Sequence, residues 1–344
     1  MASRIPRVVL HVGIHKTGTT TLQVALAALR RQLRANGVAL ITIEQMKKLR
    51  HESVWAARRT ANRLEAPLFL EEFRSLVDSE IEAVERKSGE PVRQVLVSNE
   101  RMVGARMPSE GDYPVFRPQT EAAMGEIIDA LDPGEVHVAL YTRRQDRLIE
   151  SCYLWEVQKG LSHSIREQFP FIDEPVMRYY ELANRIAKVR RVDSMRVRPF
   201  EIISGGSLAY LDDYLSNVGL DGKLDYSEFA KDPSANRSYS QKALDLARAM
   251  NPHLDTKEER DAVRRFLKKQ FSTDGYPAAK ILSDAEREKL VALYREDNER
   301  LFSTWMPELP YDAYSTVDGV AKLKSVLPKL EARPGATAVG KSAS

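Results

Sequence analysis

The sequence predicts an α/β fold in which a parallel sheet is flanked by helices and followed by a mainly helical C-terminal half. Residues 7–13 form a short, β-branched and almost wholly apolar run, which is typical of a strand buried on both faces of a parallel sheet. Residues 20–36 then place leucines at helical spacing before Gly37, and residues 38–41 resume a strand. Strand, turn, helix and strand in this order form the βαβ unit from which parallel sheets are built.

The remaining elements divide the chain into two parts. Further short strands are expected at residues 95–98, 136–142 and 195–199, with helical stretches between them. Helices are then expected at residues 208–218, 240–250, 257–271, 284–302 and 317–330. We expect a single domain over residues 1–331, with an α/β core at about 6–205, a helical part at about 206–331, and a disordered tail at 332–344.

The composition excludes several classes of protein. Among 344 residues, Lys and Arg number 52 and Asp and Glu 49, so the net charge of +3 is too small for a protein that coats nucleic acid by charge. The single cysteine, Cys152, excludes a disulfide framework and indicates a reducing compartment. Neither a signal peptide nor a transmembrane segment is evident. We therefore expect a cytoplasmic protein.

The main chemical feature is the loop between the first strand and its helix, HVGIHKTGTTT at residues 11–21. Its backbone N–H groups can form an anion nest at a helix N-terminus, so the loop is a predicted phosphate cradle. Gly13 and Gly18 have the spacing of a Walker A P-loop, but Lys16 lies two residues before the second glycine. No apolar strand ends in an aspartate placed for Mg²⁺. The pattern favours a P-loop type of sheet that binds its nucleotide without a metal ion.

The sequence KTGTT at residues 16–20 resembles the 5′-phosphosulfate loop of sulfotransferases that use 3′-phosphoadenosine 5′-phosphosulfate (PAPS). A second element supports the resemblance, because residues 138–144 read as a strand ending in two arginines, and Ser151 follows Arg143 by eight residues. Residues 197–201, 210–220 and 236–240 also look like bacterial members of this family. The resemblance therefore covers most of the chain in order.

The resemblance implies a role for each matching residue. Lys16 would contact the bridging oxygen between phosphate and sulfate and neutralise the leaving 3′,5′-ADP. Arg143 and Ser151 would hold the 3′-phosphate, for which a planar guanidinium is well suited. The sequence leaves open whether Arg143 or Arg144 faces this phosphate. The implied nucleotide-binding set, which needs no metal, is His15, Lys16, Thr17, Gly18, Thr19, Thr20, Thr21, Arg143, Ser151 and Arg237.

A general base is needed to take the proton of the acceptor as it attacks sulfur. Residues 95–98 form an apolar strand, and Glu100 follows its carboxyl end, where ligands bind in open α/β sheets. We interpret Glu100 as the base. Glu44 after the second strand, His15 in the loop and His51 are the alternatives.

The function implied is transfer of a sulfuryl group from PAPS to an acceptor, with release of 3′,5′-ADP. The acceptor group would be a hydroxyl, or in second place an amine, of a carbohydrate, lipid or small molecule. Two other functions stay open: a small-molecule P-loop kinase that uses Mg-ATP, and a non-catalytic nucleotide-binding protein. The resemblance implies no nucleic-acid partner.

Overall fold

Five parallel strands form the centre of the computed structural model, which describes residues 5–52, 65–103, 120–227 and 238–326. The sheet has the order β2-β3-β1-β4-β5. The strands are β1 (Arg7–His11), β2 (Val38–Thr42), β3 (Gln94–Ser98), β4 (Glu135–Thr142) and β5 (Ser194–Pro199). All pairs are parallel, and helices cover both faces, so the predicted fold class is confirmed.

Strand β1 is the central strand, and its position decides where a ligand can bind. It pairs with β3 on one side, from Val8↔Val95, and with β4 on the other, from Arg7↔Glu135. Strands β2 and β3 therefore lie on one side of β1, and strands β4 and β5 lie on the other. A crevice forms where the order of parallel strands reverses in this way, at their carboxyl ends. The loop after β1 lies at this point.

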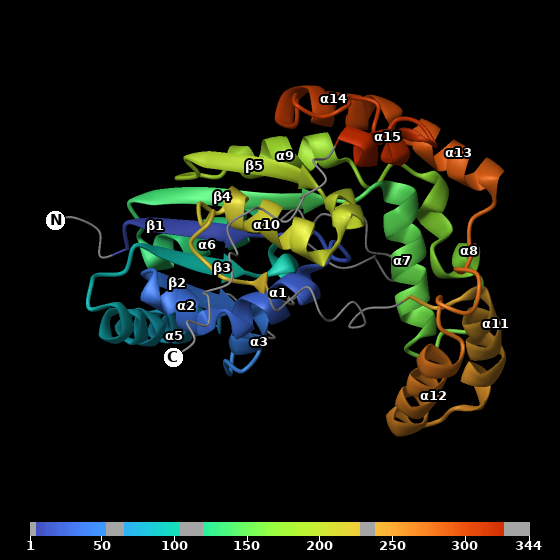
Figure 1. The fold of residues 1–344 in the computed structure, drawn as a ribbon, viewed down its shortest axis with the longest axis horizontal. Helices are drawn as coiled ribbons and strands as arrows, with labels where there is room; N and C mark the ends of the chain where they lie inside the picture. Colours follow the sequence, from blue (N-terminus) through green and yellow to red (C-terminus); the bar gives the residue numbers. More distant parts are fainter. Residues whose placement is uncertain (1–4, 53–64, 104–119, 228–237, 327–344) are drawn as a thin grey trace, which may run out of the picture.

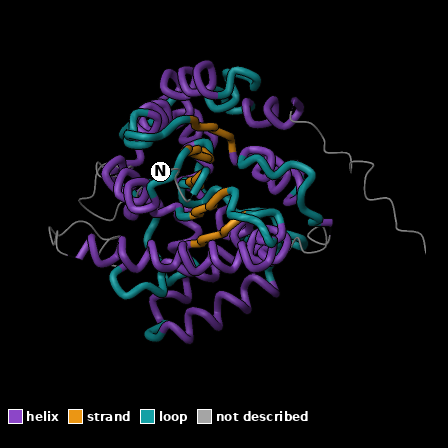
Figure 2. The backbone as a smooth tube through the Cα atoms, turned by 90° about the vertical axis from the view of Figure 1, so that its left-hand side faces the viewer, coloured by secondary structure: helices purple, strands orange, loops and turns teal. Residues whose placement is uncertain are grey.

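The two faces of the sheet are covered by different helices, which are seen on both sides of the strands in Figure 2. One face packs against apolar residues of α5 (Glu65–Ser88), α6 (Thr120–Leu131) and α9 (Tyr179–Ala187). The opposite face packs against α1 (Thr19–Ala28), α2 (Arg30–Ala35) and α10 (Ser207–Asn217). Burial on both faces explains why these strands are apolar at nearly every position.

The remaining helices gather at the carboxyl ends of the strands, where α7 (Gln145–Val157) stands across the edge of the sheet (Figure 1). The others in this region are α8 (Ile165–Gln168), α11 (Gln241–Met250), α12 (Lys257–Gln270), α13 (Asp284–Leu293), α14 (Arg295–Trp305) and α15 (Gly319–Val326). Short helical turns are α3 (Ile43–Met46), η1 (Glu100–Met102), η2 (Pro170–Asp173), η3 (Phe200–Gly205) and η5 (Asn251–His253). In the part of the chain that the structure describes, no helix is both long and apolar enough to cross a membrane.

Two predicted helices are each divided in the structure. The predicted helix at residues 20–36 becomes α1 and α2, because the backbone of Leu29 leaves the helical region with ψ of 0°. The predicted helix at residues 284–302 becomes α13 and α14, because Tyr294 does the same with ψ of 5°. Leu29 and Tyr294 are both buried, so the apolar face continues across each break. The sequence periodicity therefore predicted the buried face of each helix correctly, although it did not predict where the two helices break.

Candidate functional site

The loop between β1 and α1 has an unusual backbone. Gly13, Lys16 and Gly18 have positive φ angles of 48°, 68° and 72°. This left-handed conformation costs little for glycine but is unfavourable for a lysine, whose Cβ atom crowds the backbone. Strained non-glycine residues of this kind concentrate at ligand-binding sites.

Three carbonyl groups of the loop accept hydrogen bonds from side chains. Arg143 Nη1 donates to the carbonyl of Lys16 at 2.8 Å, and the Tyr210 hydroxyl donates to that of Thr17 at 2.6 Å. The Thr17 hydroxyl donates to the carbonyl of Ile14 at 2.7 Å. Helix α1 has neither a side-chain cap nor an acidic residue in its first turn. Its first N–H groups are therefore well placed to receive an anion.

Gly18 is required by its neighbours as well as by its φ angle. A Cβ atom at this position would lie 2.6 Å from a ring carbon of Phe200 and 3.1 Å from one of Tyr210. The two rings pack edge to face, with centroids 5.5 Å apart. The loop is thus held against the start of η3 and against α10.

Thr19, the first residue of α1, is buried, and its hydroxyl has no hydrogen-bond partner among the described residues. Buried polar atoms nearly always have a partner, so this hydroxyl is available to hydrogen-bond a ligand in the neighbouring pocket. Gly13 lies against it, since a Cβ atom there would be 3.3 Å from Thr19 Oγ1 and 3.5 Å from Glu100 Cβ. This close approach brings the end of β3 to the loop.

A pocket of about 430 Å³ lies over the loop and the N-terminus of α1. Among its lining residues that the structure describes, five carry a positive charge and one, Glu100, is a carboxylate. The lining residues are His15, Lys16, Gly18, Thr19, Thr20, Lys47, Glu100, Arg101, Arg143, Ser151, Trp155, Lys159 and Phe200. This charge balance suits an anionic ligand of nucleotide size.

Glu100 begins the turn η1 directly after β3 and is held by a side chain from α1. Gln23 Nε2 donates to Glu100 Oε2 at 3.3 Å, and it also lies within hydrogen-bond distance of the Ser98 carbonyl. His15 Nδ1 is 4.0 Å from Glu100 Oε1. A carboxylate and an imidazole thus lie together at the wall of the pocket, next to the loop lysine.

Arg143 and Ser151 line the pocket from the side of β4 and α7. The Arg143 guanidinium lies over the Phe200 ring, 5.0 Å from its centroid. Trp155 and Lys159 follow Ser151 at helical spacing along the wall, and Lys159 Nζ lies 3.6 Å from the centroid of the Trp155 ring. Cationic, hydroxyl and aromatic groups therefore share this wall, which suits a phosphate next to a flat base.

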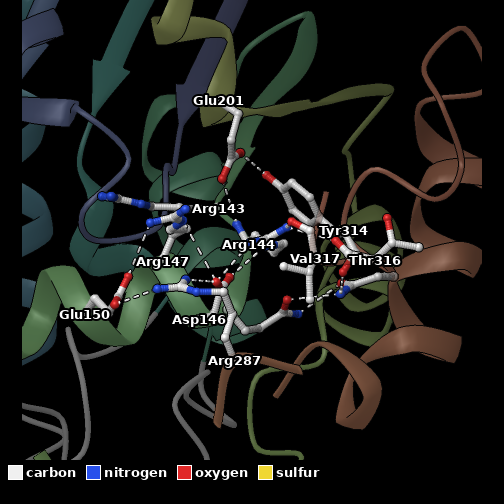
Figure 3. Close-up of polar contacts among 12 residues, drawn as sticks. Arg143, Arg144, Asp146, Arg147, Glu150, Glu201, Arg287, Tyr314, Thr316 and Val317 are labelled. Carbon is white, nitrogen blue, oxygen red and sulfur yellow. Dashed lines mark hydrogen bonds and ion pairs between the residues drawn. The ribbon is translucent and has the colours of Figure 1, made fainter. Parts of the chain in front are cut away.

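Arg144 does not line the pocket, and Figure 3 shows its side chain among Asp146, Thr316 and Val317. Its guanidinium binds both carboxylate oxygens of Asp146, at 2.7 and 3.0 Å, and is almost completely buried. It also donates to the carbonyls of Thr316 and Val317. Although burial raises the pKa of Asp146, the guanidinium groups of Arg144 and Arg287 hold it below its ordinary value. Arg143 is consequently the arginine available to a ligand.

His11 ends β1 beneath the loop and is fully buried. Its Nδ1 lies 2.9 Å from Ser98 Oγ, while its Nε2 has no partner among the described residues. The ring packs edge-on against Tyr141 and Tyr214. Burial lowers the pKa of His11 to about 3, so the ring is neutral at physiological pH.

The structure brings together most of the residues that the sequence singled out. His15, Lys16, Gly18, Thr19, Thr20, Glu100, Arg143 and Ser151 all line the pocket. Thr17 and Thr21 do not line it. Arg237 lies outside the described residues.

Two of the alternative bases lie elsewhere. Glu44 is exposed and pairs with Lys47 at 2.6 Å, and His51 Nδ1 lies 2.9 Å from a carboxylate oxygen of Glu72. Neither of them lines the pocket, whereas Glu100 and His15 do.

Several lining residues were not assigned to the nucleotide site from the sequence. Lys47 follows a short helical turn, and Arg101 directly follows Glu100. No motif marks these two residues. Trp155 carried a usable signal, because it lies one turn after Ser151 on the same face of α7, and Lys159 follows just beyond the end of this helix.

Comparisons with known proteins give a single distant similarity. No family model matches the chain, and no curated protein sequence matches it. Among solved structures, the chain is similar to a sulfotransferase from Alicyclobacillus acidocaldarius, with 15% sequence identity and a TM-score of 0.44 over 86% of this chain and 94% of that one. This similarity is too distant to assign an activity, so the functional conclusion depends on the site itself.

Proposed function

We propose that the protein is a sulfotransferase that uses PAPS as its donor. The observation that carries the proposal is the contact between Arg143 and the loop, in which the guanidinium donates to the carbonyl of Lys16 at 2.8 Å. A phosphosulfate cradle and a phosphate-binding arginine thus lie within the length of one nucleotide. A nucleotide with phosphates at both ends of its ribose fits such a pair.

The residues present fit this donor. The Thr19 hydroxyl is buried without a partner, and the first turn of α1 lacks a cap, so both can bind the 5′-phosphosulfate. Arg143 and Ser151 supply a guanidinium and a hydroxyl for the 3′-phosphate. PAPS supplies an activated sulfuryl group. The fit depends on these side chains and not on the distant structural similarity.

The chemistry assigned to the chain consists of orientation, charge stabilisation and removal of one proton. The acceptor oxygen forms a bond to sulfur, the bond from sulfur to the bridging oxygen breaks, and its electron pair stays on the 5′-phosphate. Lys16 stabilises that negative charge, and Glu100 takes the proton of the acceptor. His15, 4.0 Å from Glu100, is the alternative base. We propose a hydroxyl of a carbohydrate, lipid or small molecule as the acceptor.

Calorimetric titration tests the donor directly. Binding of 3′,5′-ADP, 5′-AMP and ATP would be compared with and without Mg²⁺, on wild type and Arg143→Ala. We expect metal-independent preference for 3′,5′-ADP, and a loss of roughly 10-fold or more of that preference in the variant, because a charge-assisted bond is removed. Arg190→Ala is the control, since that arginine is exposed and pairs with Asp129 away from the pocket.

The opposite results would point to the other candidate functions. Preference for Mg-ATP would replace the sulfotransferase by a kinase. Tight binding of 3′,5′-ADP without release of 3′,5′-ADP from PAPS, with water and with panels of phenols, sugars and lipids as acceptors, would indicate a non-catalytic nucleotide-binding protein.

A further inference from the structure

The peptide group between Arg143 and Arg144 is held at both of its polar atoms. The Tyr179 hydroxyl donates to the carbonyl oxygen of Arg143 at 2.6 Å. The N–H of Arg144 donates to Glu201 Oε1 at 3.0 Å. Tyr179 and Glu201 are both buried. Because the peptide unit is planar, fixing both atoms fixes the positions of the two Cα atoms from which the arginine side chains leave the backbone.

A residue near the C-terminus completes this arrangement. The Tyr314 hydroxyl donates to the second carboxylate oxygen of Glu201 and lies 3.2 Å from the carbonyl of Thr142, so it contacts both η3 and the end of β4. Burial raises the pKa of Glu201, while the bonds from Tyr314 and Arg144 act in the opposite direction. We call Tyr179, Glu201 and Tyr314 the peptide clamp.

A second set of contacts extends from Arg144 to the helix that carries Ser151. Asp146, which binds Arg144, also binds Arg287 of α13. Arg287 in turn donates to Glu150 Oε1 at 2.8 Å, and Glu150 directly precedes Ser151. Figure 3 shows Arg144 between Asp146, Glu201 and the segment at Thr316 and Val317. Each of the two predicted 3′-phosphate ligands is thus adjacent in sequence to a residue of this buried set.

We propose that Glu201 and Tyr314 are positioning residues for the nucleotide site, and that they set its selectivity for a 3′-phosphate by directing Arg143 toward the pocket and Arg144 away from it. The inference rests on the proposed function. A purely structural role would predict lower stability with unchanged selectivity. A positioning role predicts a change in selectivity, because the guanidinium of Arg143 would lose its fixed direction.

The chain offers a matched pair of variants to separate the two roles. Tyr314→Phe removes the hydroxyl that binds Glu201. Tyr141→Phe removes an equally buried hydroxyl, which donates to Asp213 at 2.7 Å on the other face of the sheet. For each variant, the melting temperature and the ratio of the dissociation constants of 5′-AMP and 3′,5′-ADP would be measured without Mg²⁺.

For Tyr314→Phe we expect the ratio to fall by about 3- to 10-fold, the range of one lost hydrogen bond, with the affinity for 5′-AMP unchanged. Tyr141→Phe should keep the wild-type ratio at a comparable loss of melting temperature. An unchanged ratio in Tyr314→Phe, or an equal fall in both variants, would overturn the inference alone. A wild type with no preference for 3′,5′-ADP would overturn the proposed donor and this inference with it.

A second pair keeps the test decisive if Tyr314→Phe does not fold. Glu201→Gln replaces one accepting oxygen of the peptide clamp by a donor, and Asp213→Asn does the same to the carboxylate that binds Tyr141 and Arg198. Loss of the 3′-phosphate preference in Glu201→Gln alone supports the positioning role. Retention of the preference in Glu201→Gln contradicts it.

Discussion

The two sides of the pocket are fixed in different ways. On the side of β4 and α7, the backbone of Arg143 is held by the buried peptide clamp, and its neighbour Arg144 is almost completely buried. On the side of β2 and β3, Lys47 and Arg101 are each more than a third exposed. Lys47 pairs with the exposed Glu44, and Arg101 pairs with the buried Glu52. Exposed pairs contribute little to stability, whereas buried and fully bonded groups keep one geometry.

The difference indicates which ligand each side serves. A nucleotide that is the same in every turnover is best bound by groups ordered before it arrives, because no ordering cost is then incurred on binding. The exposed side can change its residues without loss of the fold, as suits the recognition of an acceptor. Under the proposed function, the nucleotide would lie on the β4 side and the acceptor on the β3 side, where Glu100 lines the pocket.

The largest expected effect is that of Lys16→Ala, since Lys16 lies between the two sides. Release of 3′,5′-ADP from PAPS should fall by about 10³-fold, because charge on the leaving phosphate loses its main stabilising group. Binding of 3′,5′-ADP should weaken as well, since its 5′-phosphate already carries the charge that Lys16 stabilises. Lys47→Ala also removes a lysine that lines the pocket and should change the rate by only a few-fold, roughly the energy of an exposed pair. Equal effects of the two variants would contradict the assignment of Lys16.

Glu100→Gln should distinguish the roles of the two sides of the pocket most clearly. Turnover should fall by about 10²-fold or more, while the affinity for 3′,5′-ADP stays at its wild-type value, because a base acts on the acceptor. Calorimetry and the same release assay measure the two quantities. His15→Asn serves as the comparison, and a larger loss of rate in that variant would make His15 the base.

Gly18→Ala tests how rigidly the nucleotide side is built. The new Cβ atom would lie 2.6 Å from a ring carbon of Phe200, and the alanine backbone would have to keep φ of 72°. We therefore expect a loss of about 2–3 kcal/mol in the free energy of unfolding. Gly89→Ala is the matched control, because its φ is 74° but nothing lies within 4 Å of its Cβ position, and it should cost only about 1 kcal/mol. Urea unfolding curves measure both values. If Gly18→Ala lowered the free energy of unfolding no more than Gly89→Ala, the Phe200 ring would be able to move aside for the new Cβ atom.

The smallest expected effect is a pH dependence of stability that comes from His11 beneath both sides. Its pKa is about 3 in the folded protein against an ordinary value of 6.5, so as the pH falls below 6.5 the unfolded chain gains a proton that the folded chain excludes. The stabilisation is present above pH 6.5, and about 2 kcal/mol of it is lost between pH 7 and pH 5. Unfolding at several pH values measures this slope. His11→Gln should remove it, His163→Gln at an exposed site should keep it, and a slope that survives in His11→Gln would assign it to other groups.

The strands and the cradle could be predicted from the sequence because their signals are local. A strand buried on both faces is apolar throughout, and the loop combines its glycines and Lys16 within a few residues. The choice between Arg143 and Arg144 could not be made in this way. The Arg144 side chain is held by Asp146 and by the carbonyls of Thr316 and Val317, and no motif links these two distant residues to the arginines. The cations on the acceptor side were missed for the same reason, because only the fold brings Lys47 to the pocket.

If Tyr314 positions Arg143 as proposed, it also affects when, during synthesis, the protein becomes able to select its nucleotide. Lys16 is made about 300 residues before Tyr314, an interval of roughly 15–60 s at ordinary rates of translation. Contacts between such distant segments form late in folding. If the proposed function and the positioning role of Tyr314 hold, a nascent chain carries the loop after β1 well before Arg143 is held in place, and we expect it to discriminate poorly among nucleotides until the segment with Tyr314 has folded.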